Sequence, residues 1–254
     1  MEAKPSLHAT TRLYLDDDHC FTAEATVLAV ADERIAFDRT CFYPGRGGQP
    51  ADDGRVTIDN GQVLDIVSVR ADVDDVLWHS TPLQLQPELV GQRAHMALNH
   101  ERRLALMRYH TVLHVLNTTA RQDYGGWITG VQIATDYSRI DFKLDGFSPA
   151  LCAQLEARVN AVLEGSHALR SYYIAEDDFR HRDDLLRTLD VKPPVYQGRV
   201  RVVEIIGFDA QACGGTHVAN TLEVGRFSIF RTENKGRNNK RLYVRLDQPT
   251  RAMA

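Results

Sequence analysis

Short segments in which apolar and polar residues alternate fill the first hundred positions of the chain. They cover residues 22–30, 33–40, 54–58, 63–70, 76–79 and 92–98. Asp, Gly, Asn and Pro residues stand between these segments. Short strands at such close spacing favour a small β-barrel over a sheet built from β-α-β units.

A helical pattern begins at Asn99, which has the side chain of a helix N-cap. Glu101 follows in the first turn, where a carboxylate favours the helix dipole. Apolar residues then recur at helical spacing, at Leu104, Met107, Val112, Val115 and Leu116. The pattern predicts one long helix that ends at Gly125 and Gly126.

The rest of the chain mixes helices and strands. A second helix is expected between its N-cap Ser148, followed by Pro149, and Gly165. A third, more polar helix is expected over residues 177–189, before the Pro193-Pro194 pair. Strands are expected at residues 127–133, 138–143, 199–206, 225–232 and 241–246. These elements predict the α+β class.

Length and composition fit a globular protein of two small domains. The chain has 254 residues, and we place the boundary so that a β-barrel domain takes residues 1–95 and an α/β domain takes residues 96–254. The net charge of −4 does not by itself indicate a nucleic-acid binder. No apolar stretch is long enough for a membrane span, the first residues lack a secretory segment, and the four cysteines are widely scattered. These features predict a cytoplasmic protein.

Two histidines on the first predicted helix are candidate metal ligands. His110 and His114 are four residues apart, so they share one helix face and both imidazoles can reach one ion. Such pairs also arise by chance in helices with a purely structural role. Thr111 follows His110, so the glutamate that serves as general base in H-E-x-x-H metallopeptidases is absent.

A second candidate pair lies near the end of the chain, in Cys213-Gly-Gly-Thr-His217. The two glycines allow a tight turn in which the thiolate and the imidazole converge. Cysteine and histidine are the preferred ligands of zinc. Together, the two pairs predict a single zinc ion per chain, bound by His110, His114, Cys213 and His217.

The segment 42–50, with the sequence FYPGRGGQP, is the third candidate. It lacks the Gly-Lys-Ser/Thr ending of a phosphate-binding loop, and no helical pattern follows it. An ordinary barrel turn would explain its glycines. Gln49 is the residue in this turn whose amide can both donate and accept hydrogen bonds.

The fourth candidate is basic. Between residues 226 and 245 there are seven basic side chains and one acidic one, Glu233. The tip of the segment reads as a loop between two strands and carries Lys235, Arg237, Lys240 and Arg241. A flexible basic loop suits a nucleic-acid backbone, although a solvated hairpin would have the same composition.

Together, these motifs make the chain resemble the free-standing alanyl-tRNA editing proteins of the AlaX type, related to the editing domain of alanyl-tRNA synthetase. The residues that carry the resemblance are segments 21–26, 38–50, 98–99, 138–142, 202–208 and 220–221, together with the HxxxH and CxxxH motifs. The resemblance implies a translation-protein-like β-barrel followed by a zinc-containing editing domain of the threonyl/alanyl-tRNA synthetase type. The synthetase's aminoacylation domain and C-terminal extension have no counterpart, which implies a medium-length editor acting in trans.

The resemblance also implies a reaction and its residues. The expected substrate is the acceptor end of alanine tRNA carrying a wrong amino acid, serine first and glycine next, and the expected reaction is hydrolysis of the ester. Catalytic roles are implied for Gln49, His110, His114 and Cys213. Gly47, Gly48, Ile128 and Thr129 are implied for the amino-acid pocket, with Ile128 standing where relatives have a polar residue.

Some alternatives remain open at this point. Four ligands would fill a zinc tetrahedron, so either His217 is a weak ligand or zinc positions the substrate without activating water. A zinc-stabilised RNA-binding module without catalysis and a metallohydrolase of small esters are the competing functions. The sequence does not indicate an oligomeric state.

Overall fold

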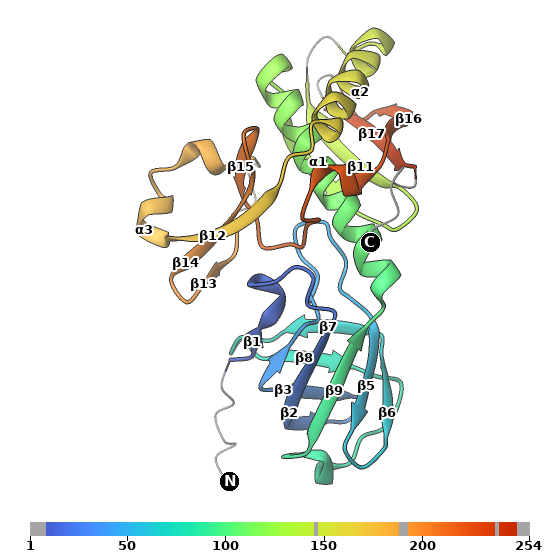
Figure 1. The fold of residues 1–254 in the computed structure, drawn as a ribbon, viewed down its shortest axis with the longest axis vertical. Coiled ribbons are helices and arrows are strands. Elements are labelled where there is room, and N and C mark those ends of the chain that lie inside the picture. Colours follow the sequence, from blue (N-terminus) through green and yellow to red (C-terminus); the bar gives the residue numbers. More distant parts are fainter. Residues whose placement is uncertain (1–8, 145–146, 188–192, 237–238, 248–254) are drawn as a thin grey trace. The chain divides into compact units, whose positions relative to one another are not determined.

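The computed structural model describes residues 9–144, 147–187, 193–236 and 239–247 (Figure 1). The chain divides into two compact units. Unit 1 contains residues 1–46 and 50–103, and unit 2 contains residues 47–49 and 104–254. The boundary expected at residues 95/96 falls inside a strand, and unit 1 continues to Arg103.

Unit 1 is built on an antiparallel sheet of seven strands. In sheet order they are β6 (Val63–Ile66), β5 (Gly54–Ile58), β9 (Arg93–Leu98), β2 (Thr22–Ala31), β3 (Arg34–Phe37), β8 (Leu77–Ser80) and β7 (Ser68–Ala71). The short parallel pair β1 (Thr11–Arg12) and β4 (Arg39–Thr40) lies outside this sheet, and 3-10 turns form at Leu13–Leu15 and Pro87–Leu89. The predicted strands are therefore present, with the expected strands 33–40 and 63–70 each broken in two.

At the first break the chain leaves the seven-stranded sheet, and at the second it passes from one edge strand to the other. At the first, the carboxylate of Asp38 accepts a hydrogen bond from the Thr26 backbone amide, 2.7 Å away, between β3 and β4. At the second, only Val67 separates β6 from β7, the two edge strands. Within the described residues the hydrogen-bonded ladder ends at these edges, so a closed barrel is not confirmed.

The core of unit 1 lies on the inner face of this sheet. Alternate residues of the strands are buried and their neighbours are exposed, as in β5 and β6. The largest fully buried apolar side chains of unit 1 are Tyr14, Phe37, Phe42, Ile35, Ile58, Leu64, Ile66, Leu77 and Met96. The alternation of apolar and polar residues that predicted the strands thus places the apolar residues in the core.

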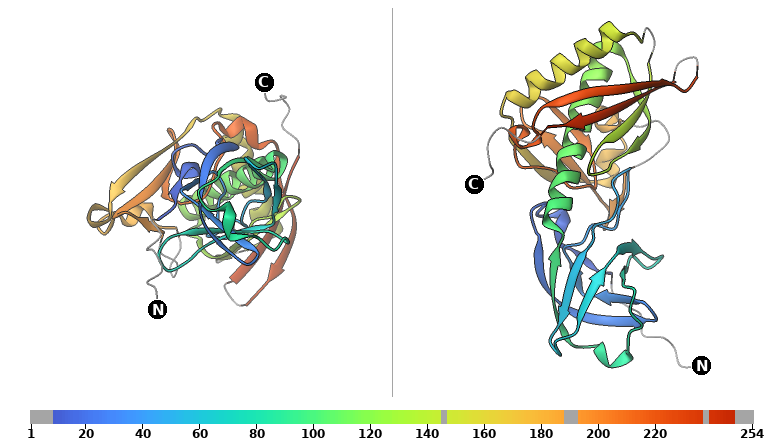
Figure 2. Two further views of the ribbon diagram at one scale, coloured as in Figure 1. Left: turned by 90° about the horizontal axis from the view of Figure 1, so that it is seen from below. Right: turned by 90° about the vertical axis from the view of Figure 1, so that its right-hand side faces the viewer.

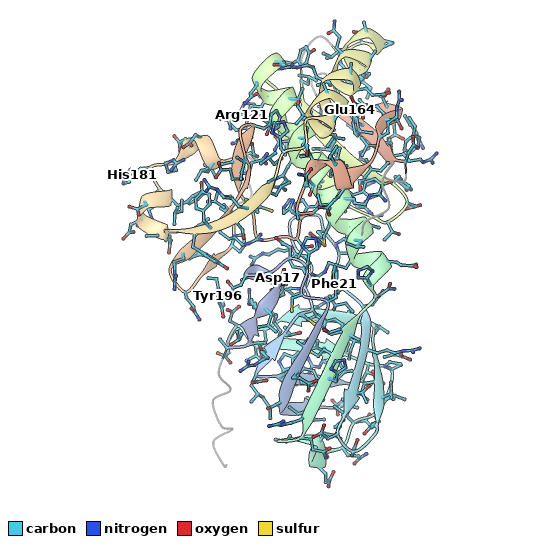
Figure 3. The ribbon with its side chains drawn as sticks, in the orientation of Figure 1. Asp17, Phe21, Arg121, Glu164, His181 and Tyr196 are labelled. Atoms are coloured by element: carbon cyan, nitrogen blue, oxygen red, sulfur yellow. The ribbon has the colours of Figure 1, made fainter. Side chains whose placement is uncertain are left out.

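Unit 2 contains α2 (Pro149–Glu164) and, apart from residues 100–103, which belong to unit 1, also α1 (His100–Tyr124). α1 begins after Asn99, whose side-chain oxygen accepts from the Arg102 amide at 3.2 Å, and it ends before Gly125. Near that end Arg121 lies over the ring of Trp127, 4.5 Å from its centroid (Figure 3). α2 begins at Ser148, whose hydroxyl accepts from the Leu151 amide. Both helices lie where the sequence predicts them.

Two sheets accompany these helices. The first, in the order β10 (Trp127–Gln132), β11 (Ser138–Lys143), β17 (Asn239–Leu246) and β16 (Phe227–Asn234), is antiparallel. The second contains β12 (Leu169–Ala175), β14 (Arg199–Ile205) and β13 (Val195–Tyr196), with β15 (Asp209–Ala212) also paired to β14. The class is mixed α and β, as predicted, and none of the helices in the described residues is long and apolar enough to cross a membrane.

Unit 2 differs from the prediction in its third helix and in three strands. The third helix is wrong: only α3 (Glu176–Phe179) and a 3-10 turn at Asp183–Leu185 form, while residues 188–189 lie outside the described part. Among the described residues of this segment, 177–187, only Leu185 is buried, so a long helix there would have no apolar face to pack. β12, β13 and β15 were not predicted: the side chains of β12 are nearly uniformly half-buried and show no alternation, and β13 and β15 have only two and four residues.

Candidate metal centre

The first two candidate ligands lie on α1, one turn apart. His110 and His114 are both buried, and their ring centroids are 5.0 Å apart. Both histidines lie in the interior of α1, because the helix begins after its cap Asn99 and ends before the glycines that follow Tyr124. Their shared face is the one that the spacing predicted.

The other two candidates lie on the loop that follows β15. The Cys213 amide donates to the Arg201 carbonyl at 3.0 Å. The buried Arg201 guanidinium donates to the Gly215 carbonyl at 2.8 Å, and the Gly215 amide points at the Cys213 sulfur, 3.4 Å away. Arg201 therefore holds the loop in the tight turn that brings Cys213 and His217 to the same side.

All four side chains meet in one cluster. Their ligand atoms lie within 4.8 Å of one another, and Cys213 Sγ is 3.5 Å from His110 Nε2 and 3.4 Å from His217 Nε2. A tetrahedral zinc ion with bonds of about 2.0–2.3 Å separates its ligand atoms by roughly 3.5 Å. The spacing and the donor set of three imidazoles and one thiol therefore fit zinc.

Burial keeps the three imidazoles neutral. It lowers the pKa of His114 to about 3, with the positive charges of Arg187 and Arg201 adding to the effect. It also lowers the pKa values of His110 and His217 well below the ordinary histidine value, and neighbouring histidines and Arg201 contribute in both cases. Neutral imidazoles have the free lone pair that a metal ion requires.

Gln49 fixes the orientation of His110. Its Oε1 accepts from the Thr216 backbone amide at 3.2 Å, which identifies that atom as the oxygen, and its Nε2 donates to Thr216 Oγ1 at 2.8 Å. Nδ1 of His110 lies 2.8 Å from the same oxygen and must carry the proton. Nε2 is then the unprotonated nitrogen, and it faces Cys213.

A similar contact holds His217. Its Nδ1 lies 3.1 Å from the hydroxyl of Thr111, the residue that follows His110 on α1. The same hydroxyl accepts from the Val218 amide at 3.3 Å. His217 is thus oriented by a hydrogen-bond partner in the same way as His110, with Nε2 toward Cys213.

Two glycines allow the close approaches in this centre. A Cβ on Gly215 would lie 2.3 Å from His110 Cε1 and 2.8 Å from Gln49 Oε1. Gly48 has a φ of +87°, and a Cβ there would lie 2.8 Å from the backbone of Val131. Its carbonyl accepts from the Ile133 amide at 2.8 Å, so the turn before Gln49 is attached to the end of β10. Gly47 also has a positive φ, +59°, but a Cβ on it would meet nothing within 4 Å.

The remaining predicted residues lie elsewhere in unit 2. Ile128 is buried on β10 and pairs with Phe142, while the exposed Thr129 donates to the Asn239 side chain at 3.0 Å. Lys235 pairs with Glu233 at 3.2 Å, and Arg241 pairs with Asp141 at 2.6 Å. Lys240 bonds to Asn234 and Gly236, and Arg237 lies outside the described residues.

The sequence did not reveal Arg201, Thr111 or Thr216 as parts of the centre. Arg201 interrupts the apolar run of β14, and a buried arginine in a strand is the signal that could have indicated a role. The two threonines have no such signal, because their side chains carry no charge and their positions follow from contacts between distant segments.

One protein family and several known proteins are similar to this chain. The family described as threonyl and alanyl tRNA synthetase second additional domain matches residues 200–243, which include the Cys213 loop. Alanyl-tRNA editing protein AlaX-M of Methanosarcina acetivorans is 34% identical over 93% of this chain and 99% of its own length. The AlaX-M protein of Saccharolobus solfataricus is 28% identical over 92% of this chain and 98% of its length. Alanine–tRNA ligase of Thermofilum pendens is 35% identical over 87% of this chain, which spans 24% of that ligase.

Proposed function

Because this chain belongs to the family of alanyl-tRNA editing proteins of the AlaX-M type, we propose that it hydrolyses the ester bond of alanine tRNA carrying a wrong amino acid, serine first and glycine next. The buried cluster of His110, His114, Cys213 and His217 is the observation that carries the proposal. A pocket separates serine from alanine by only about 1–3 kcal/mol, so a second, hydrolytic site is useful to the synthetase. We propose that the chain supplies that site in trans.

The four cluster residues would hold one zinc ion. When bound, zinc supplies a Lewis acid that polarises an ester carbonyl or lowers the pKa of water. Gln49 keeps a proton on His110 Nδ1, and Thr111 holds His217, so both Nε2 atoms stay directed at Cys213. Arg201 fixes the loop that carries Cys213 and His217.

Direct contact with the substrate is proposed for the turn at Gly47, Gly48 and Gln49. The Gln49 side chain of this turn contacts His110, where an aminoacyl ester would meet the cluster. Ile128 and Thr129 remain proposed pocket residues on β10, the strand attached to Gly48. We further propose that unit 1 is the translation-protein-like barrel of this family, because its two edge strands are consecutive in the chain.

Deacylation of a panel of charged tRNAs by the purified protein tests the function. We expect seryl-tRNA(Ala) to be hydrolysed faster than alanyl-tRNA(Ala), with glycyl-tRNA(Ala) the next best substrate. Equal rates on the serine and alanine esters would contradict an editing role. Tight tRNA binding without hydrolysis would indicate a zinc-stabilised RNA-binding module, and hydrolysis of small aminoacyl esters without tRNA binding would indicate a small-ester hydrolase.

Replacing Gln49 with leucine should weaken the metal site without removing it. The His110 Nδ1–H loses its acceptor, so the ring is no longer fixed in one tautomer, and partners of this kind typically contribute about 10–100-fold to metal affinity or activity. Zinc affinity is measured by competition with a chelator. Gln92→Leu is the control, because the side-chain amide of Gln92 donates to the Glu88 backbone carbonyl in unit 1, away from the cluster residues. Equal zinc affinity in the two variants would contradict the orienting role of Gln49.

A further inference from the structure

Three aromatic rings share the outer face of the four-stranded sheet in unit 2. Tyr137 precedes β11, Phe230 lies on β16 and Tyr243 on β17, and their ring centroids are 6.0–6.2 Å apart. Tyr137 is 40% exposed and Phe230 is 44% exposed. The core side of the same strands is taken by the buried Ile140, Phe142, Leu242 and Val244. The three rings therefore form an apolar surface, which we call the aromatic face.

A β-bulge builds this face. The pairing of β16 with β17 shifts between Ile229 and Arg231, so that Phe230 is an extra residue opposite Tyr243. The Ile229 amide is held by the carboxylate of Glu156 on α2, 2.9 Å away, which fixes the strand just before the bulge. Phe230 and Arg231 therefore both lie beside Tyr243, where regular alternation would bring only one of them.

Arginines cover the aromatic face. The Arg231 guanidinium lies 4.8 Å from the Tyr243 centroid, and that of Arg245 lies 4.5 Å from the Phe230 centroid. Arg139 is opposite Tyr243 in the register of β11 and β17, and its guanidinium has no hydrogen bond or ion pair with the part of the chain that the structure describes. Guanidinium groups beside exposed rings match a ligand that carries both flat π systems and negative charge.

The charge of this face is positive. Its basic side chains are Arg139, Lys143, Arg231, Arg241 and Arg245, and its acidic ones are Asp141 and Glu233. Both acids are already paired, Asp141 with Arg241, and Glu233 with Arg231 and Lys235. The right-hand view of Figure 2 shows the β16–β17 hairpin in front of α1. A polyanion meets complementary charge on this face.

We propose that the aromatic face binds an RNA strand, with bases stacked on Tyr137 and Phe230 and phosphates on Arg139 and Arg245. Exposed aromatic rings on a four-stranded sheet are a general means of stacking unpaired bases. The inference rests on the proposed function, which makes the strand part of the acceptor end of tRNA. The proposal places the main RNA contact on the aromatic face and not at the hairpin tip, where Arg241 forms an ion pair with Asp141.

A chain of contacts links the turn that carries Tyr137 to the metal centre. Gln49 contacts His110, the neighbouring Gly48 carbonyl accepts from the Ile133 amide, and Tyr137 follows four residues later in the turn between β10 and β11. The Tyr109 hydroxyl of α1 donates to the Asp136 carbonyl at 2.7 Å, which holds that turn. In the proposed complex, an RNA strand with its end at the cluster would follow these segments to reach the rings.

Affinity for uncharged tRNA, measured by fluorescence anisotropy at several salt concentrations, tests the proposal independently of hydrolysis. Tyr137→Leu and Phe230→Leu keep apolar side chains but remove the flat ring, and each should weaken binding by about tenfold. Arg139→Gln and Arg245→Gln should each flatten the slope of log affinity against log salt by about 0.7–0.9. Thermal unfolding confirms that each variant is folded.

Matched control variants come from the other sheet of unit 2. On β12, Arg170 lies 5.9 Å from the centroid of Tyr172 and pairs with Glu204, a similar arrangement of arginine, ring and acid. Tyr172→Leu and Arg170→Gln should leave tRNA affinity and salt slope unchanged. In tRNA carrying 4-thiouridine near its 3′ end, photocrosslinks should map to the peptides that contain Tyr137 and Phe230.

Unchanged affinity for uncharged tRNA in Tyr137→Leu and Phe230→Leu would overturn the proposal. Self-association of the wild-type protein that Phe230→Leu abolishes would also overturn it, because the face would then bind a second copy of the chain. Wild-type deacylation together with unaffected tRNA binding in the ring variants would reject the aromatic face and leave the proposed function intact. Binding that depends on the rings, without deacylation of any charged tRNA, would reject the function and support the RNA surface.

Discussion

Replacing Cys213 with serine should reduce the zinc content from one ion per chain to near zero and lower the deacylation rate by more than roughly a hundredfold. The Cys213 sulfur lies 3.5 Å from His110 Nε2 and 3.4 Å from His217 Nε2, which is the spacing of ligands on one zinc ion. A serine hydroxyl is a harder ligand that is not ionised at neutral pH, and it replaces a thiolate poorly at zinc. Metal analysis and single-turnover deacylation measure the two effects.

Two other cysteines serve as controls for this variant. Cys20 and Cys152 are also free thiols of intermediate exposure, and neither belongs to the cluster. Cys20→Ser and Cys152→Ser should therefore keep the zinc ion and the deacylation rate. A Cys213→Ser protein with a full zinc complement and unchanged rate would reject the metal centre.

The ligand cluster was predictable because each half of it is a local pattern. His110 and His114 lie on a helix whose face follows from spacing alone, and Cys213 and His217 lie on a loop whose glycines are visible in the sequence. The sequence also indicated Gln49, because its amide stands out in a glycine-rich turn. Its hydrogen bonds to His110 and Thr216 join segments more than 60 residues apart and required the structure.

The predictions failed where long-range packing decides the local structure. Residues 177–189 have helix-forming side chains, but with Leu185 as the only buried residue of the two short turns there, a long helix has nothing to pack against. β12 has no alternating pattern, and its pairing with β14 defines it. The basic residues near position 235 were identified correctly as a charged group, yet the pairing of Arg241 with Asp141 across β11 and β17 could not be read from composition.

Replacing Asp52 with alanine should destabilise unit 1 by about 3–5 kcal/mol. Asp52 pairs with Arg103, and their side chains are 2% and 0% exposed. The Arg103 guanidinium also donates to the backbone carbonyls of Cys41 and Asp18, at 2.7 and 3.0 Å, and cannot move to water. Without the carboxylate, a buried positive charge loses its counterion, and the Tyr43 amide loses its acceptor at 2.6 Å.

Denaturant unfolding followed by tryptophan fluorescence measures the loss of stability of unit 1. The chain has two tryptophans, Trp78 in unit 1 and Trp127 in unit 2. In a Trp127→Phe background, fluorescence reports on Trp78 alone. Asp65→Ala is the control: Asp65 pairs with Arg55 in the same unit, with side chains 66% and 73% exposed, and such surface pairs contribute about 0–1 kcal/mol.

An Asp52→Leu, Arg103→Met double variant separates charge burial from hydrogen bonding. Apolar replacement of a buried ion pair is often neutral when no other group depends on it. Here the carbonyls of Cys41 and Asp18 and the Tyr43 amide would lose their partners, so the double variant should remain less stable than the wild type. Wild-type stability in the double variant would mean that these three backbone groups find other partners, and that the pair acts only by neutralising its own charges.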